Sequence, residues 1–123
     1  MILGIGTDII EIERLANATQ RLVDRVFTKD ETARLSEAVG RRAEQLAGMF
    51  AAKEAVAKAL GCGFGRISPN EIEVLQEDSG KPYIQLLGKA KTVSNELSAD
   101  TVHISISHCT NYAVAFAILM RNA

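Results

Sequence analysis

Residues 42–61 read RAEQLAGMFAAKEAVAKALG, a long segment that is rich in alanine and contains no proline. Alanine is the strongest helix former, so this composition predicts a helix from about Arg42 to Leu60, and Gly61 is a natural C-terminal stop. On a helical wheel, the apolar side chains of the segment gather on one face. That face is made of Leu46, Met49, Phe50, Ala57 and Leu60. We therefore expect a long helix that covers a hydrophobic core.

Lys53 falls inside the apolar face of this helix. One interpretation is that its hydrocarbon stem lies along apolar surface while its ammonium group reaches water. The other is that the cation is held against an anionic ligand or a carboxylate at the edge of the core. The pattern alone leaves both interpretations open.

The chain before this helix begins with an apolar run. Residues 2–7 predict a short buried strand, in which glycines thin the packing or admit a close neighbour, and Asp8 is expected at its end. Apolar residues at helical spacing then predict a helix from Ile9 to about Val26. Asp8 would stand directly before this helix, where an aspartate is a common N-cap.

A second helix is predicted where Thr28 is followed by Glu31, because this spacing has the form of a capping box. Its apolar positions continue to Val39, and we expect Gly40 to break it.

Beyond Gly61 the period of the apolar residues changes from helical to alternating. Residues 72–87 predict a β-hairpin that turns at Asp78-Ser79-Gly80, and residues 89–97 predict a short helix. Two further strands are expected, one through residues 102–106 and one that ends at Met120. Helices dominate the first half and strands the second, which favours an α+β fold with helices packed on a largely antiparallel sheet.

The composition is that of a globular protein and excludes several classes. With 123 residues, 47% of them hydrophobic and 24% charged, the chain is expected to form a single domain over residues 1–123. A net charge of -1 and the lack of an aromatic and basic cluster give no attraction to nucleic acid. The apolar runs are too short to cross a membrane, and Met1-Ile2-Leu3-Gly4 lacks the charged start of a signal peptide. We therefore expect a cytoplasmic protein.

Asp8, Glu54 and Lys58 are candidates for a site that binds a metal and phosphate. Taken singly, Asp8 has an ordinary explanation as a helix cap, and Glu54 with Lys58 is a common surface ion pair one helical turn apart. If the first strand ends beside the helix, however, the two carboxylates form a hard oxygen site. Mg²⁺ needs only one or two carboxylates together with water and substrate phosphates.

His108 and Cys62 have weaker claims to chemistry. His108 has the same strand parity as Val102, Ile104 and Ile106, which favours a core or strand-end histidine over a catalytic base. A nucleophile pair of Cys62 with His108 lacks a third orienting group. Cys62 and Cys109 show no metal-ligand spacing, so we interpret both as unpaired thiols.

Four motifs together resemble the holo-acyl-carrier-protein synthases over essentially the whole chain. The motifs are Gly4-Ile5-Gly6-Thr7-Asp8-Ile9, the segment from Phe50 to Gly61, the turn Gly80-Lys81-Pro82-Tyr83, and Ser105-Ile106-Ser107-His108. Their order and spacing match that family. The resemblance implies the 4'-phosphopantetheinyl transferase fold. It also implies transfer of 4'-phosphopantetheine from coenzyme A to a serine of apo-acyl carrier protein, with release of adenosine 3',5'-bisphosphate, in support of fatty acid biosynthesis.

The resemblance also implies roles for individual residues. Asp8 and Glu54 match the magnesium ligands of the family, and Lys58 matches a lysine near the diphosphate, so these three are the expected catalytic residues. Other positions match the surroundings of the bound coenzyme A. They are Arg41, Gly61, Gly63, Gly65, Pro82 and His108. Met49 departs from the family, in which this position often carries arginine, so we expect a weaker hold on coenzyme A unless Arg42 replaces the contact.

Relatives of this length imply a homotrimer with active sites at subunit interfaces. The family docks the acidic carrier protein on the first helical region, where this chain has Arg14, Arg21 and Arg25. Two alternatives compete with the transferase interpretation. One is a non-catalytic module that binds coenzyme A or a carrier protein, and the other is a magnesium-dependent diphosphate enzyme of unrelated fold. The combination of Asp8, Glu54 and Lys58 argues against the first, and the conjunction of motifs argues against the second.

Overall fold

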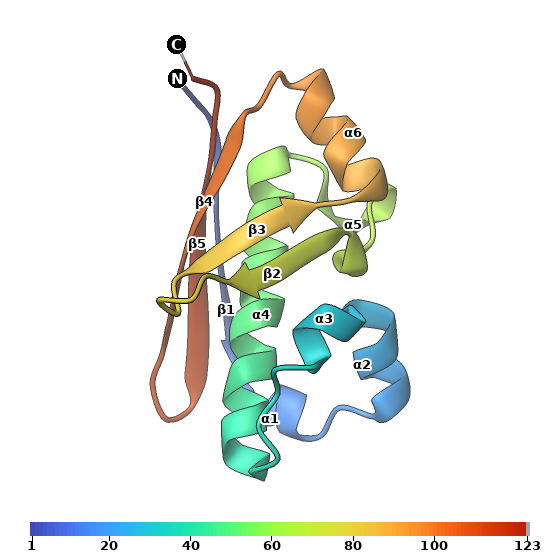
Figure 1. Cartoon of the computed structure of the whole chain (residues 1–123), viewed down its shortest axis with the longest axis vertical. Coiled ribbons are helices and arrows are strands. Elements are labelled where there is room, and N and C mark those ends of the chain that lie inside the picture. The colour runs from blue at the N-terminus through green and yellow to red at the C-terminus, as the bar shows by residue number, and fades with distance from the viewer. Residues whose placement is uncertain (123) are drawn as a thin grey trace.

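The computed structural model describes residues 1–122 (Figure 1). In chain order, the elements are β1 (Ile2–Glu11), α1 (Ile12–Ala16), α2 (Gln20–Val26), α3 (Lys29–Thr32), α4 (Val39–Leu60), α5 (Gly63–Arg66), the 3₁₀ helix η1 (Pro69–Glu71), β2 (Ile72–Gln76), β3 (Pro82–Leu86), α6 (Gly88–Glu96), β4 (Thr101–His108) and β5 (Tyr112–Met120). None of the helices in this part of the chain combines the length and apolarity needed to span a bilayer.

The long helix α4 is confirmed and forms the centre of the molecule. It ends at Gly61, whose φ of 79° is left-handed and therefore suits glycine. The helix begins at Val39, three residues earlier than expected, so the predicted break at Gly40 is wrong. A glycine near a helix end lowers helical propensity only modestly, and here the packing of the rest of α4 outweighs it.

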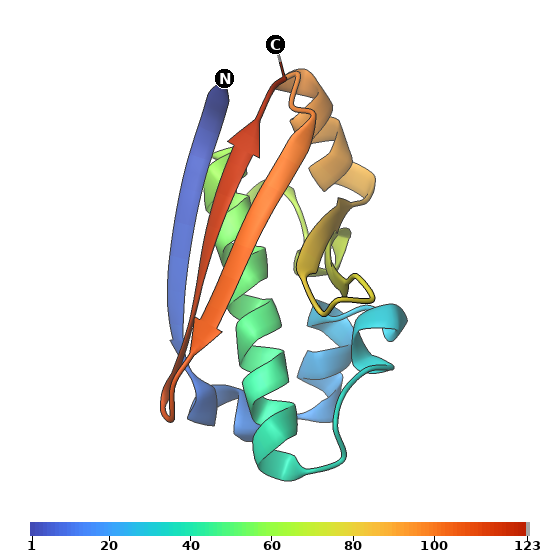
Figure 2. The same ribbon diagram turned by 60° about the vertical axis from the view of Figure 1, so that its left-hand side comes forward.

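A three-stranded antiparallel sheet covers one side of α4, with the strand order β1-β5-β4 (Figure 2). The small alanines of β5 point toward the helix, and Ala113, Ala115 and Ala117 are almost completely buried. Small side chains on the strand, facing the alanines of α4, let the helix lie close to the sheet. The two chain ends lie side by side, since Arg121 donates its backbone N–H to the carbonyl oxygen of Met1.

The predicted helix from Ile9 to Val26 is wrong at its start and in its middle. β1 continues to Glu11, and Asp8 lies inside the strand opposite Ala115. The residues from Ile5 to Ile9 alternate between the two faces of the sheet, and pairing with β5 along this stretch outweighs the weak helical spacing. The helical part is divided into α1 and α2, and Thr19 caps α2 by accepting a hydrogen bond from the Leu22 N–H.

The capping box at Thr28 and Glu31 is confirmed, with both of its hydrogen bonds formed. The helix that it begins, α3, nevertheless ends at Thr32 and does not reach Val39. The chain instead passes through an irregular link to α4. In that link the Ser36 N–H donates to the side chain of Gln45.

The predicted hairpin is confirmed as β2 and β3, which form a separate two-stranded sheet. It crosses the side of α4 that the large sheet leaves open, together with α2, α3 and α6 (Figures 1 and 2). β3 lies beside β4 without joining its ladder of hydrogen bonds. The fold is therefore the expected α+β arrangement, with α4 held between an antiparallel sheet and a second layer of short elements.

Candidate functional site

The main chains of β1 and α4 are in direct contact because two glycines of the strand face the helix. A Cβ atom at Gly4 would overlap the carbonyl oxygen of Ala59, and one at Gly6 would overlap that of Ala55. Only glycine allows this contact. The close approach brings the next inward-facing residue of β1, Asp8, to the flank of α4 that carries Glu54 and Lys58.

Asp8 and Lys58 form an ion pair between strand and helix. The Lys58 Nζ lies 3.3 Å from Asp8 Oδ1 and donates a hydrogen bond of 2.9 Å to the carbonyl oxygen of Thr7. The Asp8 side chain is 19% exposed and that of Lys58 is 54% exposed, so the pair is open to solvent. Interpreting Asp8 as a helix cap is wrong, because β1 continues to Glu11 and the next helix begins only after it. Lys58 pairs with Asp8 on the strand rather than with Glu54 on its own helix.

Glu54 completes the group beside Asp8. Partial burial raises the pKa of its carboxyl group, the negative charge of Asp8 raises it further, and the positive charge of Lys58 opposes the shift. Two carboxylates thus share a partly dehydrated position with one compensating cation. Such a pair is stabilised by a further positive charge.

Asp8 and Glu54 suit Mg²⁺, which needs few protein ligands, and do not suit a metal that is held entirely by protein side chains. Within residues 1–122 there is no group of three or more histidine, cysteine, aspartate and glutamate side chains that could hold a metal. Mg²⁺ retains several waters and binds through one or two carboxylates plus substrate phosphates. Asp8 and Glu54 supply that donor set, and the charge of Asp8 contributes to raising the pKa of Glu54.

A separate cavity of about 240 Å³ lies where the β2–β3 hairpin meets the N-terminal half of α4. We call it the hairpin cavity. Residues of four regions line it: Glu31, Arg34 and Leu35 in and after α3; Arg41, Glu44, Gln45, Gly48 and Met49 of α4; Val74, Gln76, Gly80 and Pro82 of the hairpin; and Ile106 and His108 of β4. The cavity therefore combines arginines with apolar walls, which suits a flat and anionic ligand.

The hairpin cavity brings together three of the residues that were expected to surround coenzyme A, Arg41, Pro82 and His108. His108 ends β4 and is 41% exposed, with its Nδ1 3.2 Å from Glu44 Oε2. Of the interpretations of His108, the structure thus favours the strand end over the core. Met49, the departure from the family, also lines this cavity.

The glycines expected near coenzyme A lie elsewhere. Gly61, Gly63 and Gly65 follow the C-terminal end of α4, whereas Arg41 lies in its first turn. At 1.5 Å per residue, that separation along the helix is about 30 Å. One chain by itself therefore does not gather the glycines with Arg41, and the suggested Cys62–His108 pair does not form for the same reason.

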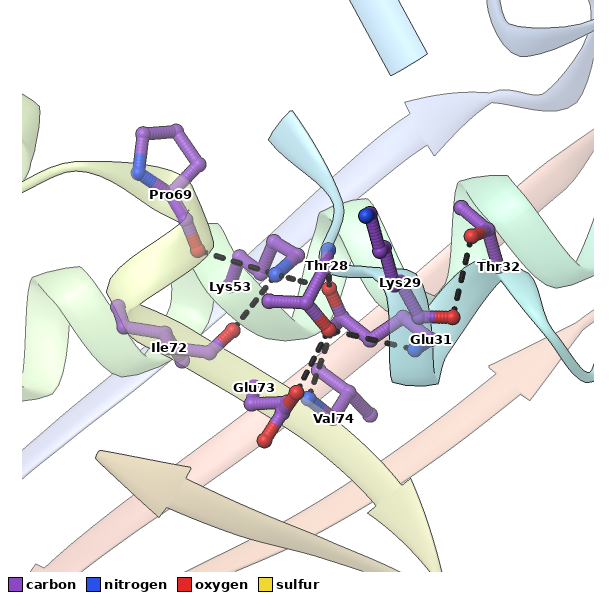
Figure 3. A network of polar contacts seen from close by, with 9 residues as sticks. All are labelled: Thr28, Lys29, Glu31, Thr32, Lys53, Pro69, Ile72, Glu73 and Val74. Atoms are coloured by element: carbon purple, nitrogen blue, oxygen red, sulfur yellow. Dashed lines mark hydrogen bonds and ion pairs between the residues drawn. The ribbon is translucent and has the colours of Figure 1, made fainter. Parts of the chain in front are cut away.

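Lys53 is completely buried, so the interpretation that its ammonium group reaches water is wrong. Its Nζ lies 2.9 Å from Glu31 Oε1 in a network that links α3, α4 and β2 (Figure 3). Burial lowers the pKa of Lys53, while the charge of Glu31 and the hydrogen bond that Lys53 donates to it act in the opposite direction. The sequence did not predict Glu31 as the partner of Lys53, because the capping box with Thr28 already accounted for a glutamate at this position.

Arg14, Arg21 and Arg25 are exposed on α1 and α2. None of them takes part in an ion pair with another residue of the described range 1–122. Leu22, 42% exposed, lies next to Arg21 on the same short helix. We call these side chains the basic surface; the exposed acids Glu11, Glu13 and Asp24 lie among them and reduce its net charge.

The sequence from residue 4 to residue 117 matches the 4'-phosphopantetheinyl transferase superfamily. The chain belongs to this family. Among its relatives, the holo-[acyl-carrier-protein] synthase of Alkaliphilus metalliredigens is 47% identical over 96% of this chain and 98% of its own. The enzyme of the same description from Clostridium novyi is 44% identical over 97% of this chain and 88% of its own.

Solved structures agree with the sequence matches. The holo-(acyl-carrier-protein) synthase of Bacillus anthracis, described in complex with CoA (3',5'-ADP), has a TM-score of 0.82 and 37% identity, with 99% of each chain covered. The synthase of Neisseria meningitidis has a TM-score of 0.87 at 32% identity, covering 98% of this chain and all of its own. The Helicobacter pylori synthase in complex with coenzyme A has a TM-score of 0.81 at 27% identity, covering 94% of this chain and 99% of its own.

Proposed function

We propose that this protein transfers 4'-phosphopantetheine from coenzyme A to a serine of an apo-acyl carrier protein, in support of fatty acid biosynthesis. The relatives that match the chain over nearly its whole length are described as holo-acyl-carrier-protein synthases, and two similar structures are described with coenzyme A or its 3',5'-ADP part. The observation that carries the proposal is the convergence of Asp8, Glu54 and Lys58 at the contact between β1 and α4.

Asp8 and Glu54 are the residues that would hold Mg²⁺ beside the diphosphate of coenzyme A. When bound, Mg²⁺ supplies positive charge that neutralises the diphosphate oxygens. Lys58 is half exposed and pairs with Asp8, so its ammonium group can turn toward the same phosphates. There it would stabilise the charge on the departing phosphate.

The chemical step is a substitution at phosphorus. The serine oxygen of the carrier protein forms a bond to the phosphorus that bears the pantetheine arm, and the bridging P–O bond of the diphosphate breaks. Adenosine 3',5'-bisphosphate leaves with the electron pair, and the serine proton passes to water or to a carboxylate of the site. The chain's contribution is to align the two reactants and to hold positive charge near the leaving group.

The hairpin cavity is our candidate for the adenosine end of coenzyme A. Arg41 and Arg34 provide charge for a phosphate, and Pro82 and Ile106 provide apolar walls for a base. The glycines at 61, 63 and 65 would approach the phosphates through their backbone N–H groups. These glycines and the cavity belong to opposite ends of α4, so we propose that they act together through neighbouring copies of the chain.

The outer face of the large sheet supports this assembly. Ile5 is 61% exposed, Ile9 65% and Phe116 44%, and all three lie on the face turned away from α4. An apolar face of this kind on a sheet is typical of a surface that another protein covers. We propose a homotrimer in which each site takes its carboxylates from one copy and its hairpin cavity from the next.

The basic surface of Arg14, Arg21 and Arg25 is our candidate for docking of the acidic carrier protein. Exposed charges without partners attract an opposite charge mainly by accelerating encounter.

We further propose that residues 1–123 act as one domain and that the protein works in the cytoplasm, where coenzyme A and carrier proteins meet.

The decisive experiment is incubation of the protein with coenzyme A, Mg²⁺ and an apo-carrier protein, followed by mass spectrometry of the carrier. We expect phosphopantetheine on the carrier serine with the native protein and little with Glu54→Gln. Coenzyme A binding without transfer to any of several carriers would instead favour a binding module. Full activity of Glu54→Gln would overturn the assignment of the carboxylate pair.

A further inference from the structure

Lys53 is the centre of a buried polar network (Figure 3), and its partner Glu31 lines the hairpin cavity. The Lys53 Nζ donates to Glu31 Oε1 at 2.9 Å, to the carbonyl oxygen of Ile72 at 2.6 Å and to that of Pro69 at 3.0 Å. An ammonium group has three donors, so every one of them is used. The side chain is therefore fixed in one position.

Glu31 extends the network from the lysine to two more parts of the chain. Its Oε1 accepts the Thr28 N–H and its Oε2 accepts the Val74 N–H, each at 2.8 Å. The hydroxyl group of Thr28 donates to Glu73 Oε2 at 2.6 Å. The single Lys53–Glu31 pair thus ties the start of α3, helix α4, η1 and strand β2 together.

The stability of the fold does not by itself explain this pair. Lys53 occupies a core position on a helix whose neighbouring buried side chains are alanine, valine and leucine. Removing two charges from water costs about as much as their attraction returns, and well-packed apolar residues often replace such a pair without loss. What an apolar pair does not provide is a set of directed bonds that fix how four elements lie relative to one another.

Three of these four elements, α3, α4 and β2, contribute lining residues to the hairpin cavity. Glu31 and Val74 are both lining residues, so the network reaches the cavity directly. Arg34 lies three residues after Glu31, in the turn that follows α3, and Met49 precedes Lys53 on α4 by one helical turn. Any shift of β2 or α3 against α4 would therefore change the distance between the arginines and the apolar walls of the cavity.

We propose that the Lys53–Glu31 ion pair is a positioning device that sets the shape of the hairpin cavity for the adenosine bisphosphate part of coenzyme A. The proposal rests on the function proposed above, because it takes this part of coenzyme A as the ligand. Lys53 and Glu31 act through Arg34 and the hairpin and not by touching the reacting atoms. They are positioning residues for binding.

The test variant removes both charges of the Lys53–Glu31 pair and replaces them with side chains of similar size. In the double variant Lys53→Met/Glu31→Gln both partners of the ion pair lose their charge together, Glu73 keeps its hydrogen bond from the Thr28 hydroxyl group, and the amide oxygen of the new glutamine can still accept one backbone N–H. We expect the Kd for adenosine 3',5'-bisphosphate, measured by calorimetry, to rise roughly tenfold, as loosened positioning of a site typically costs. Glu54 follows Lys53 directly but lies on the flank of α4 beside β1, away from the network, so the shift in Tm caused by Mg²⁺ at Asp8 and Glu54 should stay unchanged.

Val56→Ala is the matched control. Val56 is buried in the same helix but makes no polar contact, so this variant lowers stability without touching the network. Its Kd should equal that of the native protein. An unchanged Kd in the folded double variant, or an equal rise in Val56→Ala, would overturn the proposal. If the native protein itself does not bind adenosine 3',5'-bisphosphate or coenzyme A, the proposed function fails instead.

A second measurement uses the native protein and does not depend on the variant folding. If the pair determines the affinity for the ligand, the ligand must stabilise the pair to the same extent. Hydrogen exchange of the Val74 amide, which donates to Glu31, should therefore slow on addition of adenosine 3',5'-bisphosphate more than that of Ala115 in β5. Equal slowing of the two amides would contradict the proposal.

Discussion

Gly6 of β1 lies directly against the backbone of Ala55 in α4, so close that a Cβ atom at Gly6 would overlap the Ala55 carbonyl oxygen. The neighbouring atoms are main chain, so they have no flexible side chain that can move aside. We expect Gly6→Ala to push β1 away from α4, to destabilise the fold by about 1–3 kcal/mol, and to separate Asp8 from Glu54. Denaturant unfolding and the transfer assay measure the two effects.

Gly40→Ala is the control for this prediction. Gly40 lies in α4, and a Cβ atom added there would have no neighbouring atom within 4 Å, so the added volume meets no obstacle. Alanine is the better helix former, and we expect a gain of about 0.5–1 kcal/mol with unchanged transfer. Equal activity of Gly6→Ala and the native protein would show that the close approach is not needed for the site.

Glu54→Gln tests whether the proximity of the Asp8 and Glu54 carboxylates lowers the stability of the folded protein. The pKa of Glu54 is raised in the folded protein by burial and by Asp8, so its charged form is disfavoured there relative to the unfolded chain. The resulting penalty is absent below the ordinary pKa of a glutamate and fully present above the raised one, and stability falls as the pH rises between them. We therefore expect the metal-free variant to have a higher Tm than the native protein at pH 7, with no gain near pH 4.

Magnesium should reverse that order. Addition of Mg²⁺ is expected to raise the Tm of the native protein and not that of Glu54→Gln, because binding to the folded state alone stabilises it. Melting curves in the presence of a chelator and of Mg²⁺ make the comparison. An equal response of the two proteins would remove Glu54 from the metal site.

Helix α4 and the hairpin were predictable from the sequence because local signals agreed with the fold. The alanine-rich segment, Gly61 and the turn at residues 78–80 all act within a few residues. β1 was misjudged beyond Thr7, since its extension depends on pairing with β5, more than 100 residues away along the chain. The same limit applied to Lys53: its position on the apolar face was visible, but its partner Glu31 lies 22 residues earlier in a separate helix.

Within the candidate site, the family motifs named the residues that the structure brings together at β1 and α4. They could not show that Arg41 and the glycines after α4 lie at opposite ends of one helix. This separation is a property of the three-dimensional arrangement and has no counterpart in sequence spacing. It also leads to a prediction about how copies of the chain share a site.

Mixing two inactive variants tests the shared site. Glu54→Gln damages the carboxylate end and Arg41→Ala damages the hairpin cavity, so each should be inactive alone. If neighbouring copies supply the two ends, random exchange of subunits at a 1:1 ratio restores both intact ends at roughly one quarter of the interfaces. The transfer assay after co-refolding should therefore recover a corresponding part of the native activity. No recovery in a mixture shown to contain both variants would place both ends in one chain.

Met49→Arg should strengthen the binding of coenzyme A. Met49 lines the hairpin cavity near Arg41 and Gln45, where an added guanidinium group can reach a phosphate. We expect the Kd for coenzyme A to fall roughly fivefold at low salt and less at high salt, since the gain is electrostatic. Met49→Leu keeps the volume without the charge and should bind as the native protein does. Equal affinity of Met49→Arg and the native protein would mean that the cavity holds its ligand without this position.

Arg14→Glu should slow transfer by weakening the encounter with the carrier protein. Arg14 is exposed on α1 and forms no ion pair with any other residue in the range 1–122, so its charge is available to an acidic partner. Because exposed charges act mainly on association, we expect kcat/KM for the carrier to fall about tenfold at low salt and the difference to shrink as salt is added. The Kd for coenzyme A should not change. Lys91→Glu alters the net charge equally but lies on α6, at the opposite end of the molecule from α1 (Figure 1), and should leave kcat/KM near the native value. An equal loss in both variants would indicate a general effect of net charge and would exclude α1 as the docking surface.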